Sequence, residues 1–462
     1  MSQPKTGIAG AHLVRYGIPA DQRYLLGPFL PTYDQLVVNA NILAHTPLSI
    51  SGFLSQKAKK PYLIDPKTHA LQHGYGFLLS ESKASNGKIK SSWAKLIEDY
   101  GEPFKGAIIG SKRSVEPRDF RSPMVLADMC SRVVDFQLTT VTGELTEKKD
   151  AKYLKFVSKV KGVDLTSYPP SLVVAPYFYL DANDFEAWLD VNVRCLDSTA
   201  TSRPKHLPLA AEIVLPRSLM VTKTTSDRIL GAYGGAAKPD VFLLWIDEFS
   251  EHGAKVNELA AWCDFVKRLS AIAPVVNLNG GYLSTMLVRY VCRGKMVGVC
   301  HGPGYGETRQ VIPVSGGVPV AKFYLPGLHH RLSPLPAVEA IRALGGMTNA
   351  ATYFGEVCDC PQCKKVVVMD PENDLDAYFS SKAASYWSRG RWTTRDFPTA
   401  EAMDLCVKHY MYCKTREFEE KTDLAAVMAN LKAAGKRLSG VLGDETVHAS
   451  TWPKFLADIG AI

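Results

Sequence analysis

The sequence predicts an α/β fold, a TIM-type (β/α)8 barrel followed by a separate C-terminal lobe. Three observations support this prediction. The chain contains eight short apolar runs that end in polar or glycine residues, several of them rich in Val, Ile and Leu, as strands buried on both faces are. Amphipathic helical patterns lie between the later runs, and this alternation indicates a parallel sheet. After about Pro334 the pattern changes to helices and polar loops.

The expected strands follow one another along the chain with uneven spacing. They are the runs PLSIS (47–51), PYLID (61–65), SLVVAPYFYLD (171–181), AAEIVLP (210–216), DVFLLWIDE (240–248), PVVNLNGG (274–281), MVGVCHGPG (296–304) and VAKFYLPGLHH (320–330). Helical patterns begin at Lys255 and at Ser284. About a hundred residues separate the second run from the third, which is enough for an inserted helical segment at about 76–168. We therefore expect residues 1–334 to form the barrel and residues 335–462 the lobe.

Composition excludes some classes of protein. The hydrophobic content of 46% over 462 residues is ordinary for a globular protein that is not membrane-embedded. No apolar run reaches the roughly 18 residues of a membrane span, and the N-terminus lacks the apolar core of a signal peptide. We expect a cytoplasmic protein with no membrane partner. The net charge of +8 permits a polyanionic partner without requiring one.

Three of the ten cysteines, Cys358, Cys360 and Cys363, lie within six positions of one another. In a reducing compartment this spacing favours a tetrahedral zinc site over disulfides. The fourth ligand comes from elsewhere: His409 on a helical segment is preferred, with Cys413 second and Cys406 third. Four protein ligands leave no open position, so the Zn2+ is expected to be structural. Five isolated cysteines are predicted to be core residues, namely Cys130, Cys195, Cys263, Cys292 and Cys300.

A barrel followed by Cys-x-Cys-x-x-Cys and a helical histidine resembles the tRNA-guanine transglycosylase family, including the relatives that install 7-deazaguanine bases in DNA. The resemblance covers roughly Pro61 to Glu420, and its specific part is the cysteine motif. It implies that Asp65, at the end of an early strand, works beside the reacting base. It also implies that a Gly-Gly loop, here Gly280 and Gly281, lies close to that base.

The family's nucleophile does not match. The family carries an aspartate at the end of its last barrel strand, whereas the run that we assign to that strand has no acid between Val320 and Pro334. This departure favours hydrolysis over covalent base exchange, unless Asp247 or Glu248 acts from a neighbouring strand.

Strand ends supply the remaining candidates, because catalytic residues of such barrels lie at the carboxyl ends of the strands. The candidate catalytic residues are Asp65, Asp247 and Glu248. Each has a structural alternative: Asp65 in an Asp-Pro turn, and the acid pair as solvated residues or a helix cap. The candidate substrate-binding residues are Gly280, Gly281, His301, Tyr305, Glu307, His329 and His330.

A nucleic-acid partner is predicted from interleaved aromatic and basic residues, which suit stacking and phosphate contact. They are Trp387, Arg389, Arg391, Trp392 and Arg395. Some fifty residues remain after His409, and they show no recognisable tRNA-binding module, so DNA is favoured over tRNA. Homodimerisation stays open.

The leading hypothesis is a DNA glycosylase that removes a modified base, in defence against phages. One alternative is a guanine transglycosylase that inserts a 7-deazapurine into DNA or tRNA. Another is a nucleic-acid-binding subunit without catalysis.

Overall fold

The computed structural model describes residues 5–81, 86–146, 159, 168–304, 306–312, 321–379, 384–388, 391–395 and 400–462. Within them, eight parallel strands form one sheet in the order β3-β2-β1-β8-β7-β6-β5-β4. The strands are β1 (His12–Tyr16), β2 (Gln35–Asn39), β3 (Tyr62–Asp65), β4 (Val173–Val174), β5 (Leu209–Pro216), β6 (Val241–Asp247), β7 (Val275–Asn277) and β8 (Met296–His301).

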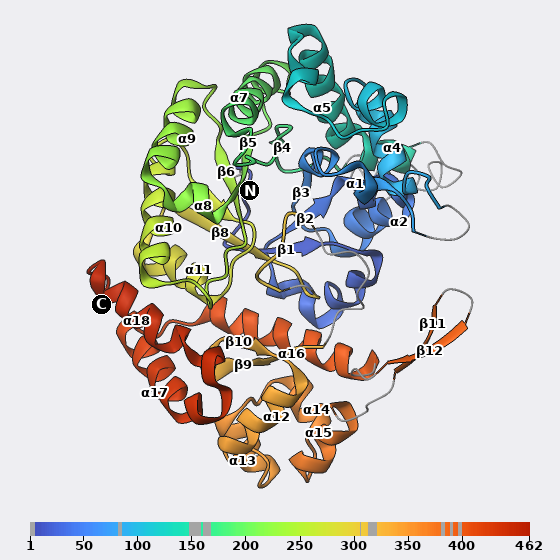
Figure 1. Ribbon diagram of the computed structural model, residues 1–462. Helices are drawn as coiled ribbons and strands as arrows, with labels where there is room; N and C mark the ends of the chain where they lie inside the picture. Colours follow the sequence, from blue (N-terminus) through green and yellow to red (C-terminus); the bar gives the residue numbers. More distant parts are fainter. Residues whose placement is uncertain are drawn as a thin grey trace.

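The sheet curls into a nearly closed barrel (Figure 1). β8 pairs with β1, with Leu13 opposite Cys300. Between β3 and β4, Ser171 N donates a hydrogen bond of 2.8 Å to Tyr62 O. The predicted (β/α)8 barrel is therefore confirmed as an eight-stranded parallel barrel with helices around it.

Two of the eight predicted strands are wrong. The run at 47–51 lies in helix α2 (Pro47–Gly52), and the run at 320–330 contains an antiparallel hairpin of β9 (Phe323–Leu325) and β10 (His330–Leu332) outside the barrel. The true β1 and β2 were missed because their apolar runs are short: Arg15 interrupts β1, and the polar residues Gln35 and Asn39 leave only three apolar residues between them in β2. The last barrel strand is β8, which ends at His301.

The helices of the barrel part cover the outer face of the strands (Figure 1). They are α1 (Ala40–His45), α2, α3 (Tyr75–Leu78), α4 (Ser91–Tyr100), α5 (Pro123–Thr146), α7 (Phe185–Ser202), α8 (Arg217–Val221), α9 (Lys223–Gly235), α10 (Val256–Leu269) and α11 (Tyr282–Met286). Between β3 and β4 lie α3, α4 and α5, where the sequence predicted an inserted helical segment. Some connections differ from the standard unit: 3-10 turns join β1 to β2, and π-helical turns follow α2, α4 and α11.

The remaining helices and strands follow β8 and lie on one side of the barrel (Figure 1). They are β9, β10, α12 (Pro334–Ala343), α13 (Ala350–Glu356), α14 (Pro361–Val366), α15 (Pro371–Phe379), β11 (Ala384–Ser388), β12 (Arg391–Arg395), α16 (Ala400–Glu419), α17 (Leu424–Leu442) and α18 (His448–Asp458). Helix α16 lies between the barrel and the rest of this part, and its Phe418 ring stacks on His12 of β1. Among the described residues, no helix is long and apolar enough to cross a membrane.

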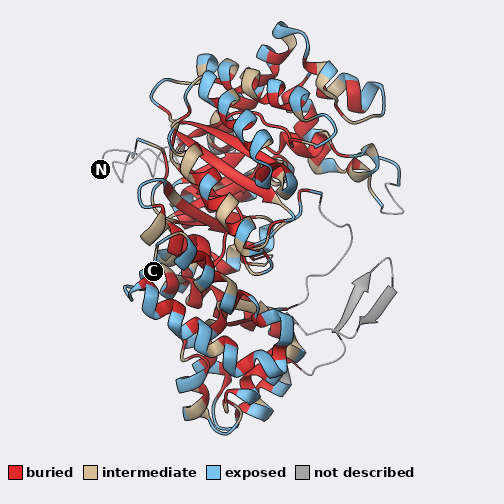
Figure 2. Cartoon of the chain, turned by 60° about the vertical axis from the view of Figure 1, so that its left-hand side comes forward, coloured by how far each residue is buried: buried red, intermediate tan, exposed pale blue. Residues whose placement is uncertain are grey.

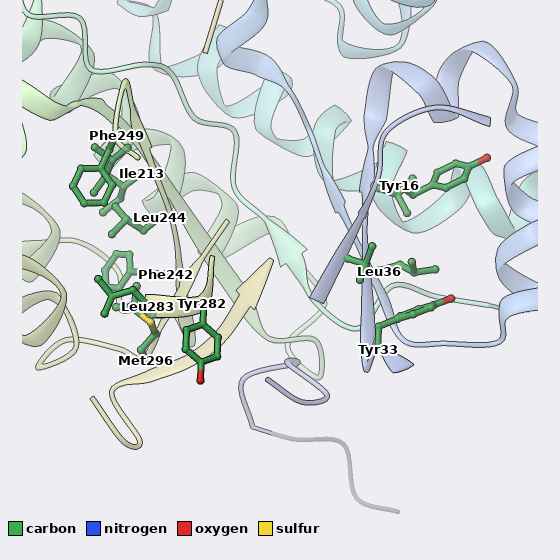
Figure 3. Close-up of a cluster of buried hydrophobic side chains, with 14 of the residues drawn as sticks. Tyr16, Tyr33, Leu36, Ile213, Phe242, Leu244, Phe249, Tyr282, Leu283 and Met296 are labelled. Atoms are coloured by element: carbon green, nitrogen blue, oxygen red, sulfur yellow. The ribbon is translucent and has the colours of Figure 1, made fainter. Parts of the chain in front are cut away.

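Strand alternation divides the core into two apolar clusters. Outward side chains pack against the helices, and Figure 3 shows Ile213, Phe242 and Leu244 together with Leu283 and Met296 on one side of the barrel. Inward side chains such as Leu13, Val37 and Leu243 fill the interior. The strands are buried along their length, whereas the helices expose one face (Figure 2). Towards the carboxyl ends of the strands the inward residues become polar, and this change marks the candidate site.

Candidate active site and metal centre

Asp65 ends β3 and faces the interior at the carboxyl mouth of the barrel, where it is 1% exposed. The Lys67 ammonium lies 2.6 Å from its Oδ2. The Tyr177 hydroxyl and the Lys67 backbone N donate hydrogen bonds to its Oδ1, of 2.7 and 3.0 Å. Both carboxylate oxygens therefore have fixed partners, and the side chain has one orientation.

The backbone at Lys67 has φ +56°, in the left-handed region that lysine rarely adopts. This conformation turns the chain after Pro66 and returns the side chain towards Asp65. The ammonium also lies 4.8 Å from the centroid of the Trp245 ring on β6. Local backbone strain of this kind concentrates at functional sites.

A second carboxyl, Glu212 of β5, is 1% exposed in the same interior. Tyr177 lies beside it, but the Tyr177 hydroxyl is directed at Asp65, and neither Glu212 oxygen has a well-aligned hydrogen bond among the described residues. On the opposite side, Arg15 donates to Asn279 Oδ1 at 2.9 Å and to Leu278 O at 2.5 Å. Buried polar atoms without partners are uncommon in native folds, so this interior is built for more than packing.

The two carboxyls have opposite protonation tendencies. Burial acts to raise the pKa of Asp65, but the adjacent Lys67 ammonium and the hydrogen bonds outweigh it and hold that pKa below its ordinary value. Burial raises the pKa of Glu212 far above its ordinary value, and the negative charge of Asp65 adds to the rise. Asp65 is thus biased towards the ionised form and Glu212 towards the protonated form, a division that suits acid–base chemistry.

The chain after β8 covers this mouth. Arg309 O accepts a hydrogen bond of 3.1 Å from the Trp245 indole, and Val311 N donates one of 2.9 Å to Asp247. The Val311 side chain is buried in the interior cluster. Asp247 is thus half-buried at the mouth and holds this loop, whereas Glu248 is exposed in a turn with φ +56°.

A separate charged cluster surrounds Gly281, beyond the end of β7. Gly281 N donates to Glu251 at 2.8 Å, and a Cβ built on Gly281 would lie 3.0 Å from oxygens of both Glu251 and Glu307. Burial raises the pKa of Glu251 to about 7. Glu307 is paired with Lys414 of α16 at 2.5 Å, and Lys414 with Glu417 at 2.7 Å. Gly280 is close-packed as well, since its Cβ would lie 2.5 Å from Val299.

His301 and the two later histidines lie outside the barrel interior. His301 faces α16, with its Nε2 2.7 Å from Nε2 of His12. His329 and His330 belong to the β9–β10 hairpin and its turn, not to a barrel strand end as the sequence interpretation had them; they contact Glu417 at 2.7 Å and Glu445 at 2.6 Å. Tyr305 lies outside the described residues.

The predicted metal ligands come together. Cys358, Cys360, Cys363 and His409 are all buried, and their ligand atoms lie within 4.8 Å of one another. His409 Nδ1 is 3.4 Å from the Cys360 sulfur and 3.3 Å from the Cys363 sulfur. Ligand atoms of a tetrahedral zinc site are about 3.5–3.8 Å apart, so the donor set fits a thiolate-rich tetrahedral ion.

The surroundings of His409 orient it for this role. Its Nε2–H donates to Tyr324 O at 2.6 Å, which leaves the Nδ1 lone pair facing the sulfurs. Its ring stacks on Phe323 with a centroid separation of 4.3 Å. Cys413 lies 3.7 Å from the His409 ring nitrogens but is not part of the four-residue group. The five isolated cysteines are buried, as predicted.

The predicted nucleic-acid contacts fall on β11 and β12, which pair with Trp387 opposite Trp392. Arg391 and Arg395 begin and end β12. Arg389 lies outside the described residues. For the tryptophans and arginines of β11 and β12 the structure describes the backbone only.

The sequence interpretation missed most of the mouth. Lys67, Tyr177, Arg15 and Asn279 lie near predicted strand ends or in an unrecognised strand, and no short motif marks them. Glu212 had a usable signal, since an acid in the middle of the apolar run AAEIVLP is costly to bury.

Neither family models nor curated proteins match this chain. Among solved structures, xylanase B from Clostridium stercorarium F9 is similar with a TM-score of 0.30 and 11% identity, covering 66% of this chain and 88% of the xylanase. A likeness at this score carries no argument about the fold or the reaction.

Proposed function

We propose that this protein hydrolyses the N-glycosidic bond of a modified base in DNA. The observation that carries the proposal is the pair of buried carboxyls in one barrel mouth, Asp65 with its pKa lowered by Lys67 and Glu212 with its pKa raised by burial. Breaking such a bond requires a proton for the departing base and negative charge beside the oxocarbenium-like sugar. The two carboxyls meet these two requirements.

In this proposal Glu212 donates its proton to the leaving base. Asp65, oriented by Tyr177 and kept ionised by Lys67, stabilises the positive sugar and directs water to its anomeric carbon. A base enters the site only when it is flipped out of the DNA stack. The loop that contains Arg309 and Val311 must also move, because it closes the mouth.

The Cys3His cluster supports the resemblance to the transglycosylase family, since it follows the barrel and uses a histidine from a long helix. We assign it to zinc. With four protein ligands the ion would hold α14 and α16 together, and it supplies no step of the reaction. The net charge of +8 and the basic residues of β12 support a DNA partner. A role in defence against phages with modified bases follows by analogy with DNA-directed relatives.

Base exchange is the second candidate, and one observation favours it. Because the last barrel strand is β8, the first acid after it is Glu307, a buried carboxylate where the resemblance implies a nucleophile. The argument against exchange that rested on the run 320–334 is therefore wrong. Glu307 is held by Lys414 and faces Gly281, so it must leave this ion pair to reach a sugar.

The test incubates the protein with DNA carrying ordinary or bulky modified bases, and separately with tRNA, without free base, and measures abasic sites. We expect abasic sites in DNA, reduced by about 100-fold or more in Asp65→Asn and Glu212→Gln. Glu186→Gln is the matched control, since that acid is exposed and pairs with Arg228 on the surface. Label incorporation that requires free base and is lost in Glu307→Gln would favour exchange. DNA binding without abasic sites and without label incorporation would favour a nucleic-acid-binding subunit that has no catalytic activity.

A further inference from the structure

In the proposed reaction, the side chain of Lys67 lies beside the position that the sugar of a flipped nucleotide would take. It is 4% exposed, faces the barrel interior and contacts the same Asp65 that the proposed reaction sets beside the anomeric carbon. Because the Lys67 ammonium lies 2.6 Å from the Asp65 carboxylate, it is also close to any substrate atom that this carboxylate contacts. Lys67 therefore has a chemical use beyond its charge, since a primary amine is a nucleophile towards carbonyl carbon.

The two buried lysines of the described residues differ in this respect. Lys414 is 1% exposed and held by two carboxylates, Glu307 and Glu417. Lys67 has one carboxylate partner and an aromatic neighbour, Trp245. Burial lowers the pKa of Lys67, against the opposing effect of Asp65, whereas the pKa of Lys414 is raised above its ordinary value. Lys67 is the lysine whose proton is more easily removed.

We propose that Lys67 forms an imine with the abasic sugar left by base removal and that the protein then cleaves the DNA strand at that site. This second activity, an abasic-site lyase, rests on the proposed function, because it uses the product of base excision as its substrate. It adds strand cleavage to base removal and needs no metal, oxidant or reductant.

The steps balance with the groups present. Lys67 transfers a proton to Asp65, and its neutral amine attacks C1′ of the ring-opened aldehyde. Protonated Asp65 returns the proton to the C1′ oxygen, then takes one proton from the attached nitrogen and passes it to the same oxygen. That oxygen leaves as water, and an iminium forms. Asp65 then removes a proton from C2′, and the bond from C3′ to the phosphate oxygen breaks. Water hydrolyses the imine of the unsaturated sugar and restores Lys67.

The test uses the full-length protein and a DNA duplex with a preformed abasic site, so that base recognition is not required. Reduction with borohydride converts the imine to a stable amine, and the protein–DNA adduct is measured on a denaturing gel. We expect an adduct and strand cleavage with the wild type. Lys67→Arg, which keeps the charge beside Asp65, should lose at least about 100-fold of both. Peptide mapping of the wild-type adduct should find the modification on Lys67.

Matched controls separate the reaction from non-specific amine chemistry and from unfolding. Lys223→Ala removes an exposed lysine at the start of α9 and should keep the adduct. Thermal melting shows whether Lys67→Arg is folded, and Lys67→Gln provides a second variant, in which the side chain is neutral. A folded Lys67→Arg that retains the adduct, or an adduct mapped to another lysine, overturns the proposal.

The two proposals fail separately. Base release from modified DNA without an adduct on preformed abasic DNA overturns the lyase and leaves the glycosylase intact. An adduct at Lys67 without release of any base supports the lyase and removes the support for base excision.

Discussion

The Lys67 ammonium and the Asp65 carboxylate form an ion pair of 2.6 Å inside the barrel, and both side chains are at least 95% buried. The two residues are separated only by Pro66. Their pairing depends on the left-handed backbone at Lys67, and so on the local turn. The pair is therefore a product of a single strand-to-loop junction, and the barrel provides the low-polarity surroundings.

Removing one member of this pair should be costly. Lys67→Met leaves an unpaired buried carboxylate, and we expect a loss of about 3–5 kcal/mol in the free energy of unfolding at pH 7, measured by urea denaturation. Because Lys67 depresses the folded-state pKa of Asp65, its contribution is present above the unfolded pKa and disappears as pH falls. The loss of stability should therefore be smaller at acid pH. The double variant Lys67→Met/Asp65→Leu should recover most of the free energy of unfolding that Lys67→Met loses at pH 7. An equal loss at both pH values would contradict this account.

The protonation of Glu212 predicts the pH dependence of base release. Burial raises its pKa, so the proton that it donates is present below the raised folded-state value and is lost as pH rises through that value. Base release should decline on the alkaline side in the wild type. In Glu212→Gln the residual rate should be low and lack this decline. Initial rates between pH 5 and 10 measure both profiles, and an unchanged alkaline limb in the variant would exclude Glu212 as the acid.

Asp247 should control the opening of the loop over the mouth. Asp247→Ala removes the acceptor of the Val311 amide, a charge-assisted bond worth about 1.5–3 kcal/mol. Exchange of the Val311 amide hydrogen should accelerate by at least about 10-fold, as measured by mass spectrometry of the peptide. Glu248→Ala, at the adjacent exposed position, should leave that exchange unchanged. Equal effects of the two variants would show that Asp247 does not hold the loop.

Gly281 should not tolerate a side chain. The Cβ of Gly281→Ala would lie 3.0 Å from carboxylate oxygens of Glu251 and Glu307, and we expect a loss of about 1–3 kcal/mol in urea denaturation. Gly231→Ala is the control, because that glycine lies within α9 with no neighbour within 4 Å of the added carbon. It should gain up to about 1 kcal/mol from helix propensity. A neutral Gly281→Ala would mean that Glu251 and Glu307 move apart easily.

Metal content tests the cysteine cluster. The purified protein should contain one zinc per chain by mass spectrometry, and Cys363→Ser or His409→Ala should lose it. Chelation should lower the melting temperature by at least about 5 °C, since binding energy of the ion is folding energy. Cys406→Ser removes a buried cysteine outside the cluster and should retain the metal. Retention in all variants would refute the site.

The sequence predicted what short-range patterns encode. β6 was recognised because Val241–Ile246 is continuously apolar, and the metal ligands because their spacing is distinctive. β1 and β2 were missed because Arg15 breaks the apolar pattern of β1 and because β2 has only three apolar residues, between Gln35 and Asn39. The hairpin of β9 and β10 was interpreted as a barrel strand because the three apolar residues of β9, Phe323–Leu325, have the same sequence pattern in a hairpin as in a barrel strand. The residues at the barrel mouth, namely Arg15, Lys67, Tyr177, Glu212 and Asn279, were missed because they come from five different strands or strand ends. They are brought together only when the barrel forms, and no local sequence pattern indicates this.

Helix α16 has a consequence for how this chain is made. It supplies Lys414 to Glu307 and Phe418 to His12, so it completes the loop after β8 and covers the outside of the β1–β8 seam. During synthesis these partners emerge from the ribosome more than a hundred residues after the last barrel strand. Until then the β1–β8 seam, where the first and last barrel strands pair, stays exposed. A shortened gene that stops at residue 334 should therefore yield aggregated protein.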